Sequence, residues 1–440
     1  MDRRVVITGL GVVSGFGVGA DALWSGLCDG RTCLGPITRF DAAGFATRLA
    51  AQLPDNFAAK DFVPKSYRKA TKVMARDSEI AVAAARACVE DARLITRGTE
   101  GENIATTYPA SRLGCQIGAG LIAAETDEMT AAMATAAGDD GRFSLRTWGG
   151  EGGQGMEALT PLWLLKYLPN MLACHVTIIH GAEGPSNTIT CAEASALLSI
   201  GESMRVIQRG AADACFSGGC ESRLNVMGLL RWSLAGMLAP TGDETDGSRI
   251  VRPYDAAAAG GLLGEGGGIL MLEEERAASA RGARAYAHLA GFGAGQSDPD
   301  YRDGERDEGM RFAIENALED AGVNASQVDA VVPMASGVPR LDAAEAGALR
   351  AVLGDHSSRV PLVTLSPHVG NCNAGHAGVQ AAVGAMCLRE QRLPARLHAG
   401  RPSGGLDAGA RGAVAANLNC VLVCTGSLGG QNAAAVLTRA

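Results

Sequence analysis

The sequence lacks several patterns that define whole classes of protein. It has no run of about 18 uninterrupted apolar residues, so no membrane span is expected. It has no long basic run, and its 47 acidic side chains outnumber its 39 basic ones, for a formal net charge of -8. That balance argues against binding to nucleic acid. Aromatic residues make up only 4%, whereas glycine occurs 59 times, which predicts tight turns and close backbone packing.

The twelve cysteines and seven histidines lack the spacing of disulfide frameworks and metal sites. There is no CxxC pair, the nearest approach being Cys420 to Cys424, and no histidine pair has HxxxH or HExxH spacing. We therefore expect free thiols, no bound metal and a reducing, cytoplasmic location. Thr8 and Gly9 interrupt the apolar part of the N-terminal segment, so no export signal is expected.

Short β-branched runs alternate with longer alanine-rich helical patterns. The patterns predict strands over 5–8, 188–190, 330–332, 361–364 and 421–423, and helices over 77–92, 194–210 and 377–389. Strands separated by helices favour an α/β architecture with a mostly parallel sheet. Two stretches of strand followed by alanine-rich helix suggest related halves, divided here into 1–250 and 251–440. The polar, glycine-rich region 95–155 is expected to cross the surface or to form a partner interface.

The segment 184–195 has the pattern of a nucleophile-bearing turn. A strand there leads through small residues into an amphipathic helix. A side chain at such a turn projects from the head of the helix, where free N–H groups favour negative charge. Enzymes place a reactive thiolate at this position, because the helix head lowers the pKa of a thiol. Here the turn offers Glu193, and Cys191 lies two residues earlier.

Further motifs are spread over nearly the whole chain. They are VITGLGVVS at 6–14, FD at 40–41, GPS at 184–186, RPYD at 252–255, GEG at 264–266, LEE at 272–274 and GGQN at 429–432. Together they resemble β-ketoacyl-acyl carrier protein synthases of the KAS II type, within the thiolase-fold condensing enzymes. The resemblance implies a thiolase-like α/β fold, in which two related halves form a layered α-β-α-β-α core, and a subunit that dimerises through its central sheet.

The family's catalytic set is a cysteine at the turn, two histidines and a lysine near the second histidine. The cysteine lies nine residues after the glycine of the Gly-Pro motif and seven before an Ile-Gly pair, and both counts reach Glu193. The spacing of a later proline and aspartate places the first histidine at Met334.

The remaining family positions are also replaced. The lysine and the second histidine correspond to Ser366 and Asn371, although a shift of one residue in the following motif would move the latter to Cys372. Leu428 stands where relatives have a phenylalanine that gates the acyl site.

These replacements predict that condensation is absent. A glutamate gives no reactive thioester, Met334 has no polar hydrogen, and Asn371 cannot transfer a proton near neutral pH. Losing one group that stabilises enolate charge commonly costs ~10²–10³ in rate, and several are missing together.

A carboxylate at a helix head is stabilised by the N–H groups that would hold a thiolate, so Glu193 could imitate the charge of an occupied site. The sequence thereby resembles the chain length factor of type II polyketide synthases, in which the turn cysteine is also replaced, usually by glutamine. The resemblance implies a heterodimer with an active ketosynthase, or a homodimer, in fatty-acid or polyketide biosynthesis. It also implies acyl carrier protein as a partner, its acyl-phosphopantetheine as the substrate group, and no bound cofactor.

An active enzyme is the alternative. A condensing enzyme, decarboxylase, acyltransferase or hydrolase could use Cys191 or Glu193, with His368, His376 or His175 as the partner of the thiol. Cys191 as nucleophile requires a two-residue shift against an ungapped spacing, and a buried strand cysteine is its simpler interpretation. A self-associating protein that binds acyl chains or carrier protein is a third possibility.

Lys65, Arg68, Lys69 and Lys72 form a basic patch that opens a helix in an otherwise acidic chain. The patch is either a solvated helix face or a docking site for acidic acyl carrier protein, since it lies where relatives receive theirs.

Overall fold

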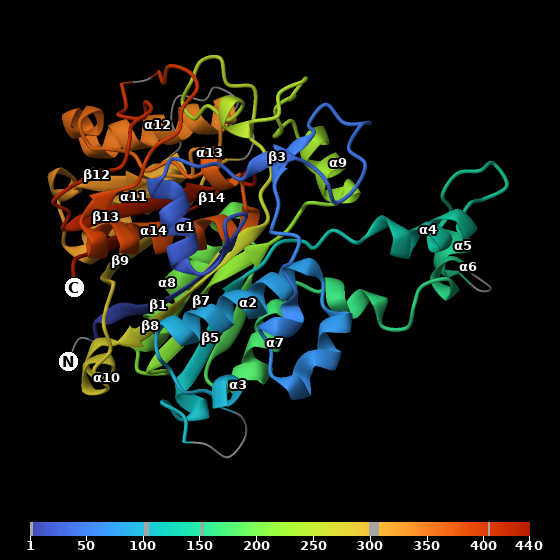
Figure 1. Cartoon of the computed structure of the whole chain (residues 1–440), viewed down its shortest axis with the longest axis horizontal. Helices are drawn as coiled ribbons and strands as arrows, with labels where there is room; N and C mark the ends of the chain where they lie inside the picture. The colour runs from blue at the N-terminus through green and yellow to red at the C-terminus, as the bar shows by residue number, and fades with distance from the viewer. Residues whose placement is uncertain (1–2, 101–104, 151–153, 299–307, 404) are drawn as a thin grey trace.

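The computed structural model describes residues 3–100, 105–150, 154–298, 308–403 and 405–440, and a mixed sheet runs through its centre (Figure 1). The strands are β1 (Val5–Ser14), β2 (Gly17–Val18), β3 (Leu34–Pro36), β4 (Leu49–Ala51), β5 (Leu113–Gly118), β6 (Ser186–Ile189), β7 (Ala214–Glu221), β8 (Gly266–Glu274), β9 (Ala287–Gln296), β10 (Ala330–Val332), β11 (Arg392–Leu393), β12 (Val414–Ala415), β13 (Cys420–Gly426) and β14 (Gln431–Thr438). Within the described residues the main sheet has the order β10-β13-β14-β9-β1-β8-β7-β5-β6, with β2 paired to β1.

The prediction of a mostly parallel sheet is wrong. Only the pairs β10–β13, β5–β6 and β5–β7 of the described sheet are parallel, whereas β1, β8, β9 and β14 meet their neighbours in antiparallel register. For β13 and β14 the reason is their connection: residues 427–430 join them, and so short a loop can only reverse the chain.

Helices cover the outer faces of the two groups of strands and also lie between the two groups. They are α1 (Ala20–Cys28), α2 (Arg76–Asp91), α3 (Arg97–Glu100), α4 (Thr126–Thr135), α5 (Leu145–Gly149), α6 (Gln154–Glu157), α7 (Met171–His180), α8 (Ser195–Gln208), α9 (Val226–Leu234), α10 (Glu275–Ala280), α11 (Glu308–Ala321), α12 (Pro339–Leu353), α13 (Ser366–Val369) and α14 (His376–Glu390). α2 and α7 pack outside the N-terminal strands, α11 and then α12 outside the C-terminal ones, and α8 and α14 lie between the two groups of strands (Figure 1). This is the layered α-β-α-β-α arrangement that the resemblance implies.

The central position of α14 explains its composition. All residues from 376 to 388 are buried, and all of them except His376 and Gln380 are apolar or small, so the helix is not amphipathic. Its backbone lies directly on β8: a Cβ added at Gly378 would stand 2.2 Å from the carbonyl oxygen of Gly268. The abundance of glycine therefore does reflect close backbone packing, as predicted.

Most predicted elements are present. The helices expected over 77–92, 194–210 and 377–389 are α2, α8 and α14, and four of the five expected strands are β1, β6, β10 and β13. The strand expected over 361–364 is wrong. Leu362 forms an isolated bridge with Val331 of β10 and Pro361 one with Asp407, and Pro361 has no N–H with which to continue a ladder.

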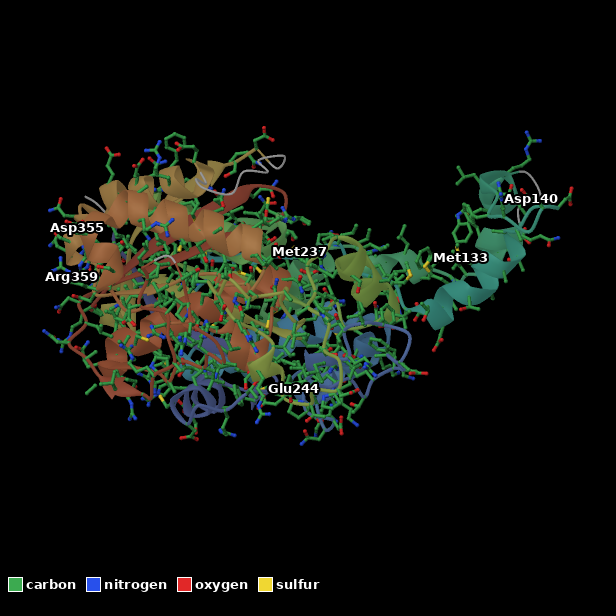
Figure 2. All side chains as sticks on the ribbon, turned by 90° about the horizontal axis from the view of Figure 1, so that it is seen from above. Met133, Asp140, Met237, Glu244, Asp355 and Arg359 are labelled. Carbon is green, nitrogen blue, oxygen red and sulfur yellow. The ribbon has the colours of Figure 1, made fainter. Side chains whose placement is uncertain are left out.

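The chain between β5 and α7 forms an arm that leaves the body of the molecule, and the first part of this arm belongs to the region 95–155. Helices α4, α5 and α6 lie on this arm, and Met133 and Asp140 stand well away from the sheet (Figures 1 and 2). The predicted surface excursion is therefore confirmed for the arm, but it is wrong for residues 113–118, which form the buried strand β5 of the main sheet. In the described part of the chain, no helix combines the length and the apolar character needed to cross a membrane.

Candidate active site

The turn after β6 is sharp and is held by a serine. β6 ends at Ile189, and the one-turn helix η5 (Ala192–Ala194) leads directly into α8. Ala192 has a φ of 47°, a left-handed conformation that costs a non-glycine residue about 1–3 kcal/mol. The Ser195 Oγ accepts a hydrogen bond from the Cys191 N–H at 2.8 Å and donates one to the Ala192 carbonyl at 2.6 Å. The backbone thus has the bend that presents one side chain at the head of α8.

That side chain, Glu193, points into the protein interior. It is 1% exposed, its Oε1 accepts a hydrogen bond from Asn371 Nδ2 at 3.2 Å, and its Oε2 has no partner. Burial raises the pKa of the Glu193 carboxyl, and the opposing effects of Arg223 and the Asn371 hydrogen bond are smaller. We expected the helix head to stabilise a carboxylate here, but burial outweighs that effect.

A second turn of the same kind faces the first. The one-turn helix η9 (Asn373–Gly375) precedes α14 as η5 precedes α8, and Asn373 also has a positive φ, 49°. Asn371 stands on this turn, with its Oδ1 accepting from the Asn373 N–H at 2.7 Å. Of the two positions left open by the sequence, Asn371 faces Glu193, whereas the buried Cys372 thiol is directed to the Val369 carbonyl at 3.8 Å.

Met334 and Ser366 form a neighbouring group. The Ser366 Oγ donates to the Met334 carbonyl at 3.2 Å, and the Thr425 hydroxyl donates to Met334 Sδ at 3.5 Å. Thr425 lies on β13, which packs against η5. The buried Glu345 carboxyl accepts hydrogen bonds from the Met334 and Ala335 N–H groups, at 2.8 and 2.9 Å. These bonds fix the backbone at Met334 and Ala335.

Comparison with known proteins identifies the family of this chain. Residues 2–278 match the family described as "Beta-ketoacyl synthase, N-terminal domain", and residues 286–400 match "Beta-ketoacyl synthase, C-terminal domain". The chain belongs to the beta-ketoacyl synthase family. It is 29% identical to the 3-oxoacyl-[acyl-carrier-protein] synthase 2 of Coxiella burnetii over 441 residues, which cover 99% of each chain.

Solved structures show the same fold. The ishigamide ketosynthase/chain length factor is matched at 26% identity over 100% of both chains, with a TM-score of 0.82. A beta-ketoacyl synthase from Burkholderia phymatum gives the same identity, coverage and TM-score. The fold is therefore the thiolase-like ketosynthase fold, as the motifs implied, while the division at residue 250 stays a prediction.

The other predicted site residues of this ketosynthase homologue lie near the two turns or on the surface. Leu428 is half-buried in the loop between β13 and β14, against an apolar cluster that includes Leu341. Cys191 is half-buried just past the end of β6, not within the strand, and burial raises the pKa of its thiol. Lys65 and Arg68 lie on the short helix η2 (Lys65–Val73). The basic side chains of η2 are all exposed, namely Lys65, Arg68, Lys69 and Lys72.

The three histidines considered as partners of Cys191 have other surroundings. The ring nitrogens of His368 face the carbonyls of Arg31 and Ala395 at 2.6 and 3.1 Å, and His175 Nδ1 meets the Tyr67 hydroxyl at 2.9 Å. Burial lowers the pKa of His376 to about 4, so its ring is neutral near pH 7. None of the hydrogen bonds found among the described residues joins the Cys191 thiol to a histidine.

Sequence reasoning missed a group of buried charged residues near the turn that bears Glu193. The Glu221 side chain is fully buried; its Oε1 pairs with Arg223 Nε at 2.5 Å, and its Oε2 accepts the Ala374 N–H at 2.8 Å. Asp77 is 1% exposed, and burial together with the nearby Glu221 raises the pKa of its carboxyl well above the usual range.

The sequence did carry a signal for Asp77. The residue stands three positions before Ile80 and four before Ala81 in an alanine-rich helix, so its side chain falls on the buried face. A carboxylate on the apolar face of a helix is uncommon without a partner or a function.

Proposed function

We propose that this chain is a non-condensing, chain-length-factor-like subunit that pairs with an active ketosynthase in fatty-acid or polyketide biosynthesis. The observation that carries the proposal is the buried Glu193–Asn371 pair, which stands where the family's nucleophile and second histidine are expected. Neither residue forms a reactive thioester, and the amide of Asn371 does not act as a general acid or base near pH 7.

The neighbouring Met334 supports the same proposal. Its thioether has no hydrogen with which to stabilise enolate charge, and it accepts a hydrogen bond from Thr425 instead. Replacement at all of these positions leaves the protein with the shape of a ketosynthase and without its reacting groups. A solved structure described as a ketosynthase/chain length factor, at 26% identity, supports a role of this kind for a chain with this fold.

Two surfaces support pairing with a second subunit. β6 is the last strand in the order of the sheet, and its Ser186 and Asn187 are exposed, so its backbone can pair with another strand. The arm exposes large apolar side chains, namely Leu121, Met133, Phe143, Leu145, Met156, Leu162 and Leu164. So many apolar side chains in one exposed region are typical of an interface with another protein.

The substrate group in this proposal is an acyl chain on the phosphopantetheine of acyl carrier protein, which docks at the basic side chains of η2. The alternative, an acyltransferase or decarboxylase that uses Cys191, is favoured only by the partial exposure of that thiol. The free state of all twelve cysteines agrees with the expected cytoplasmic location.

The test is the intact mass of the purified chain after incubation with acyl-loaded and malonyl-loaded carrier protein. We expect no adduct on this chain. When the chain is co-expressed with an active ketosynthase that forms its proposed partner, we expect a stable complex and an adduct on the ketosynthase alone. An adduct on this chain that disappears in Cys191→Ala would overturn the proposal and identify Cys191 as the nucleophile.

A further inference from the structure

Two buried carboxyl groups hold the loop that follows β10. They belong to Asp342 and Glu345, which are 2% and 4% exposed and lie one turn apart on α12. Residues at i and i+3 share a helix face, so both carboxyls meet the same surroundings. The two oxygens of Asp342 lie 3.2 and 3.1 Å from the Gly337 nitrogen and accept its N–H. Glu345 accepts the N–H groups of Met334 and Ala335 in the same loop.

The same two carboxyls hold Tyr254, on the segment that precedes β8. Asp342 accepts a hydrogen bond from the Tyr254 N–H at 2.9 Å, and Glu345 accepts one from the Tyr254 hydroxyl at 2.6 Å. Tyr254 and Ala335 have φ values of 61° and 47°, a left-handed region that residues with a Cβ occupy only where the surrounding structure holds them. Asp342 and Glu345, which we call the carboxyl clamp, therefore fix two strained stretches of backbone.

The carboxyl clamp has no basic partner among the described residues, since none of their ion pairs includes Asp342 or Glu345. The side-chain groups that touch it from other segments are the hydroxyls of Tyr254 and Ser336 and the Cys424 thiol of β13, whose Sγ lies 4.0 Å from Glu345 Oε1. A cavity of about 20 Å³ lies against the two carboxyls. Its other walls are Met310, Met334, Ser336, Leu341, Gly426 and Ser427.

The charged residues on neighbouring segments are engaged elsewhere or exposed. Arg252 Nε donates to a backbone carbonyl at 3.1 Å, and Asp255 accepts two backbone N–H groups. On α11, Arg311 pairs with two glutamates of its own helix. Arg340, in the first turn of α12, is exposed. Ser366, where the resemblance implies a lysine, donates to a backbone carbonyl and brings no charge.

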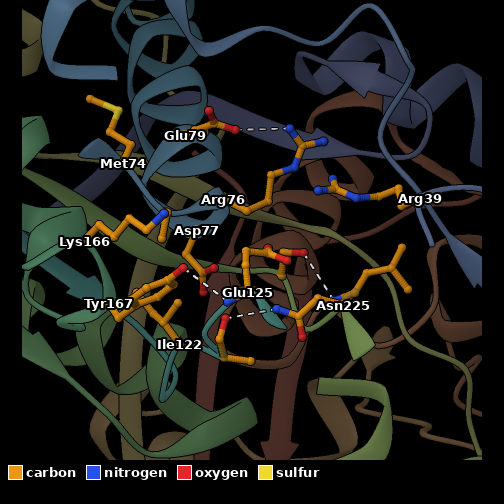
Figure 3. A pocket seen from close by; sticks show the side chains of 14 residues that line it. Arg39, Met74, Arg76, Asp77, Glu79, Ile122, Glu125, Lys166, Tyr167 and Asn225 are labelled. Atoms are coloured by element: carbon orange, nitrogen blue, oxygen red, sulfur yellow. Dashed lines mark hydrogen bonds and ion pairs between the residues drawn. The ribbon is translucent and has the colours of Figure 1, made fainter. Parts of the chain in front are cut away.

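Another buried carboxyl of this fold shows what the clamp lacks. Glu265 accepts hydrogen bonds from Arg39 and Arg76, at 2.9 and 3.0 Å, and the two guanidinium groups lie near each other in Figure 3. A buried carboxyl without such a counter-charge keeps its proton to a higher pH, and a second carboxyl nearby adds to the effect. Burial raises the pKa of Asp342 to about 6 and that of Glu345 to about 7, and the charge of Asp342 also raises the pKa of Glu345.

The clamp can hold a proton without losing its backbone contacts. A hydroxyl both donates and accepts, so a protonated Glu345 can donate to Tyr254 Oη, and a protonated Asp342 can donate to Ser336 Oγ. The N–H groups of the loop stay bonded to the same oxygens in either case. When both carboxyls are ionised, two buried negative charges face each other without a cation, and the cavity beside them has room for about one water molecule.

We propose that Asp342 and Glu345 share a proton and form a pH-sensitive clamp, which holds residues 334–337 and Tyr254 in mildly acidic solution and releases them when both carboxyls ionise. The folded chain binds these protons more tightly than the unfolded chain, whose carboxyls have pKa values of about 3.9 and 4.3. The hold is therefore complete in acid and is lost as the pH rises through 7. Met334 belongs to the released loop, so the shape of the candidate site depends on pH.

The test uses the full-length chain, labelled with ¹³C at the methionine methyl groups, between pH 5 and pH 9. We expect the Met334 methyl signal to titrate with a midpoint near pH 7, while the signal of Met133, on the arm, stays constant. Above the midpoint, amide exchange at Met334, Ala335 and Gly337 should rise about tenfold per pH unit after correction for intrinsic exchange, because opening releases one proton. A Met334 signal or a corrected exchange rate that does not change with pH would overturn the proposal.

Variants of the clamp assign the titration to its two members. Glu345→Gln keeps a hydrogen-bonding oxygen and cannot ionise, so the transition near pH 7 should disappear. Asp342→Asn removes the like charge, so the midpoint should fall to a lower pH. Glu319→Gln, at an exposed carboxylate of α11, is the matched control and should titrate as the wild type does.

Two results with these variants contradict the proposal. One is a transition near pH 7 that survives in Glu345→Gln, and the other is a midpoint that Asp342→Asn leaves unchanged. The wild-type titration can contradict it without either variant, so the test does not depend on their folding. Because the measurements need neither carrier protein nor ketosynthase, their outcome is independent of the proposed pairing.

Discussion

Asn371 donates a hydrogen bond to Glu193 across 3.2 Å and thereby joins the two sharp turns that precede α8 and α14. Each turn contains one non-glycine residue with a positive φ, Ala192 or Asn373, so both are held in a conformation that the chain does not adopt freely. The relationship connects the two halves of the fold at one buried bond between a carboxyl and an amide. Neither side chain of this pair carries a thiol or an imidazole.

The stability of the protein should depend on the protonation of Glu193. Because burial raises the pKa of this carboxyl, the folded chain binds its proton more tightly than the unfolded chain does. The resulting stabilisation is complete below the unfolded pKa, about 4.3, and is lost as the pH rises through the folded value. Glu193→Gln removes this loss, so we expect its Tm at pH 8 to exceed that of the wild type by roughly 1–3 °C.

Thermal unfolding followed between pH 5 and pH 8 checks this expectation. The difference between Glu193→Gln and the wild type should grow with pH. Glu183→Gln, at an exposed carboxylate, serves as the control and should follow the wild type. A constant difference over the whole range would show that the Glu193 carboxyl does not change protonation on folding.

Glu193→Cys should restore acylation without restoring condensation. The bend at Ala192 and the head of α8 are already in place, so a thiol at position 193 stands where the family's nucleophile is expected. We expect an acyl adduct from acyl-loaded carrier protein, seen by intact mass. Malonyl decarboxylation should stay at background until Met334→His is added, because each missing donor to the enolate costs ~10²–10³ in rate. A Glu193→Cys variant whose new thiol stays unreacted would show that the turn is inaccessible to the acyl group.

The basic side chains of η2 should set the affinity for carrier protein. Reversing two charges, Lys65→Glu with Arg68→Glu, should weaken binding about tenfold at low salt, because exposed charges steer association and are screened as salt rises. Arg359→Glu, at the opposite end of the molecule from the arm, is the matched control (Figure 2). Titration by fluorescence anisotropy at two ionic strengths measures the effect, and an unchanged affinity at low salt would contradict it.

The arm should be needed for pairing and not for folding. Leu145 and Leu162 are 77% and 79% exposed, so replacing both with serine removes apolar contact area without opening the core. We expect the double variant to keep the wild-type Tm and to lose at least about tenfold in affinity for the ketosynthase, measured by biolayer interferometry. Phe312→Ser, on the outer helix α11, should bind as the wild type does. A double variant with full affinity would remove the arm from the interface.

The sequence was sufficient for those parts of the fold that local pattern determines. The alanine-rich helices α2, α8 and α14 were predicted within a few residues, because apolar spacing and turn residues mark their ends. Strand direction was not predictable in this way: β13 and β14 run antiparallel because of a short loop, and no periodicity within a strand records that. The strand prediction at 361–364 was wrong because it rested on the apolar residues alone and did not take account of the N–H that Pro361 lacks.

Position along the chain located the candidate site but not its surroundings. Motif spacing reached Glu193 and Asn371, which the structure places in contact. It did not reach Glu221 and Arg223, because their importance comes from burial beside the turn, and burial depends on how β7 packs against distant segments. The direction of the Glu193 pKa shift was missed for the same reason, since a helix head is visible in a sequence and the loss of solvent is not.

The exposed apolar side chains of the arm also bear on how much of this protein a cell can hold on its own. When such a surface is not covered, it associates with other hydrophobic surfaces and is bound by chaperones or cleaved by proteases. In the proposed heterodimer the ketosynthase covers this surface. We therefore expect the amount of this chain in a cell to depend on the synthesis of the ketosynthase as well as on its own synthesis.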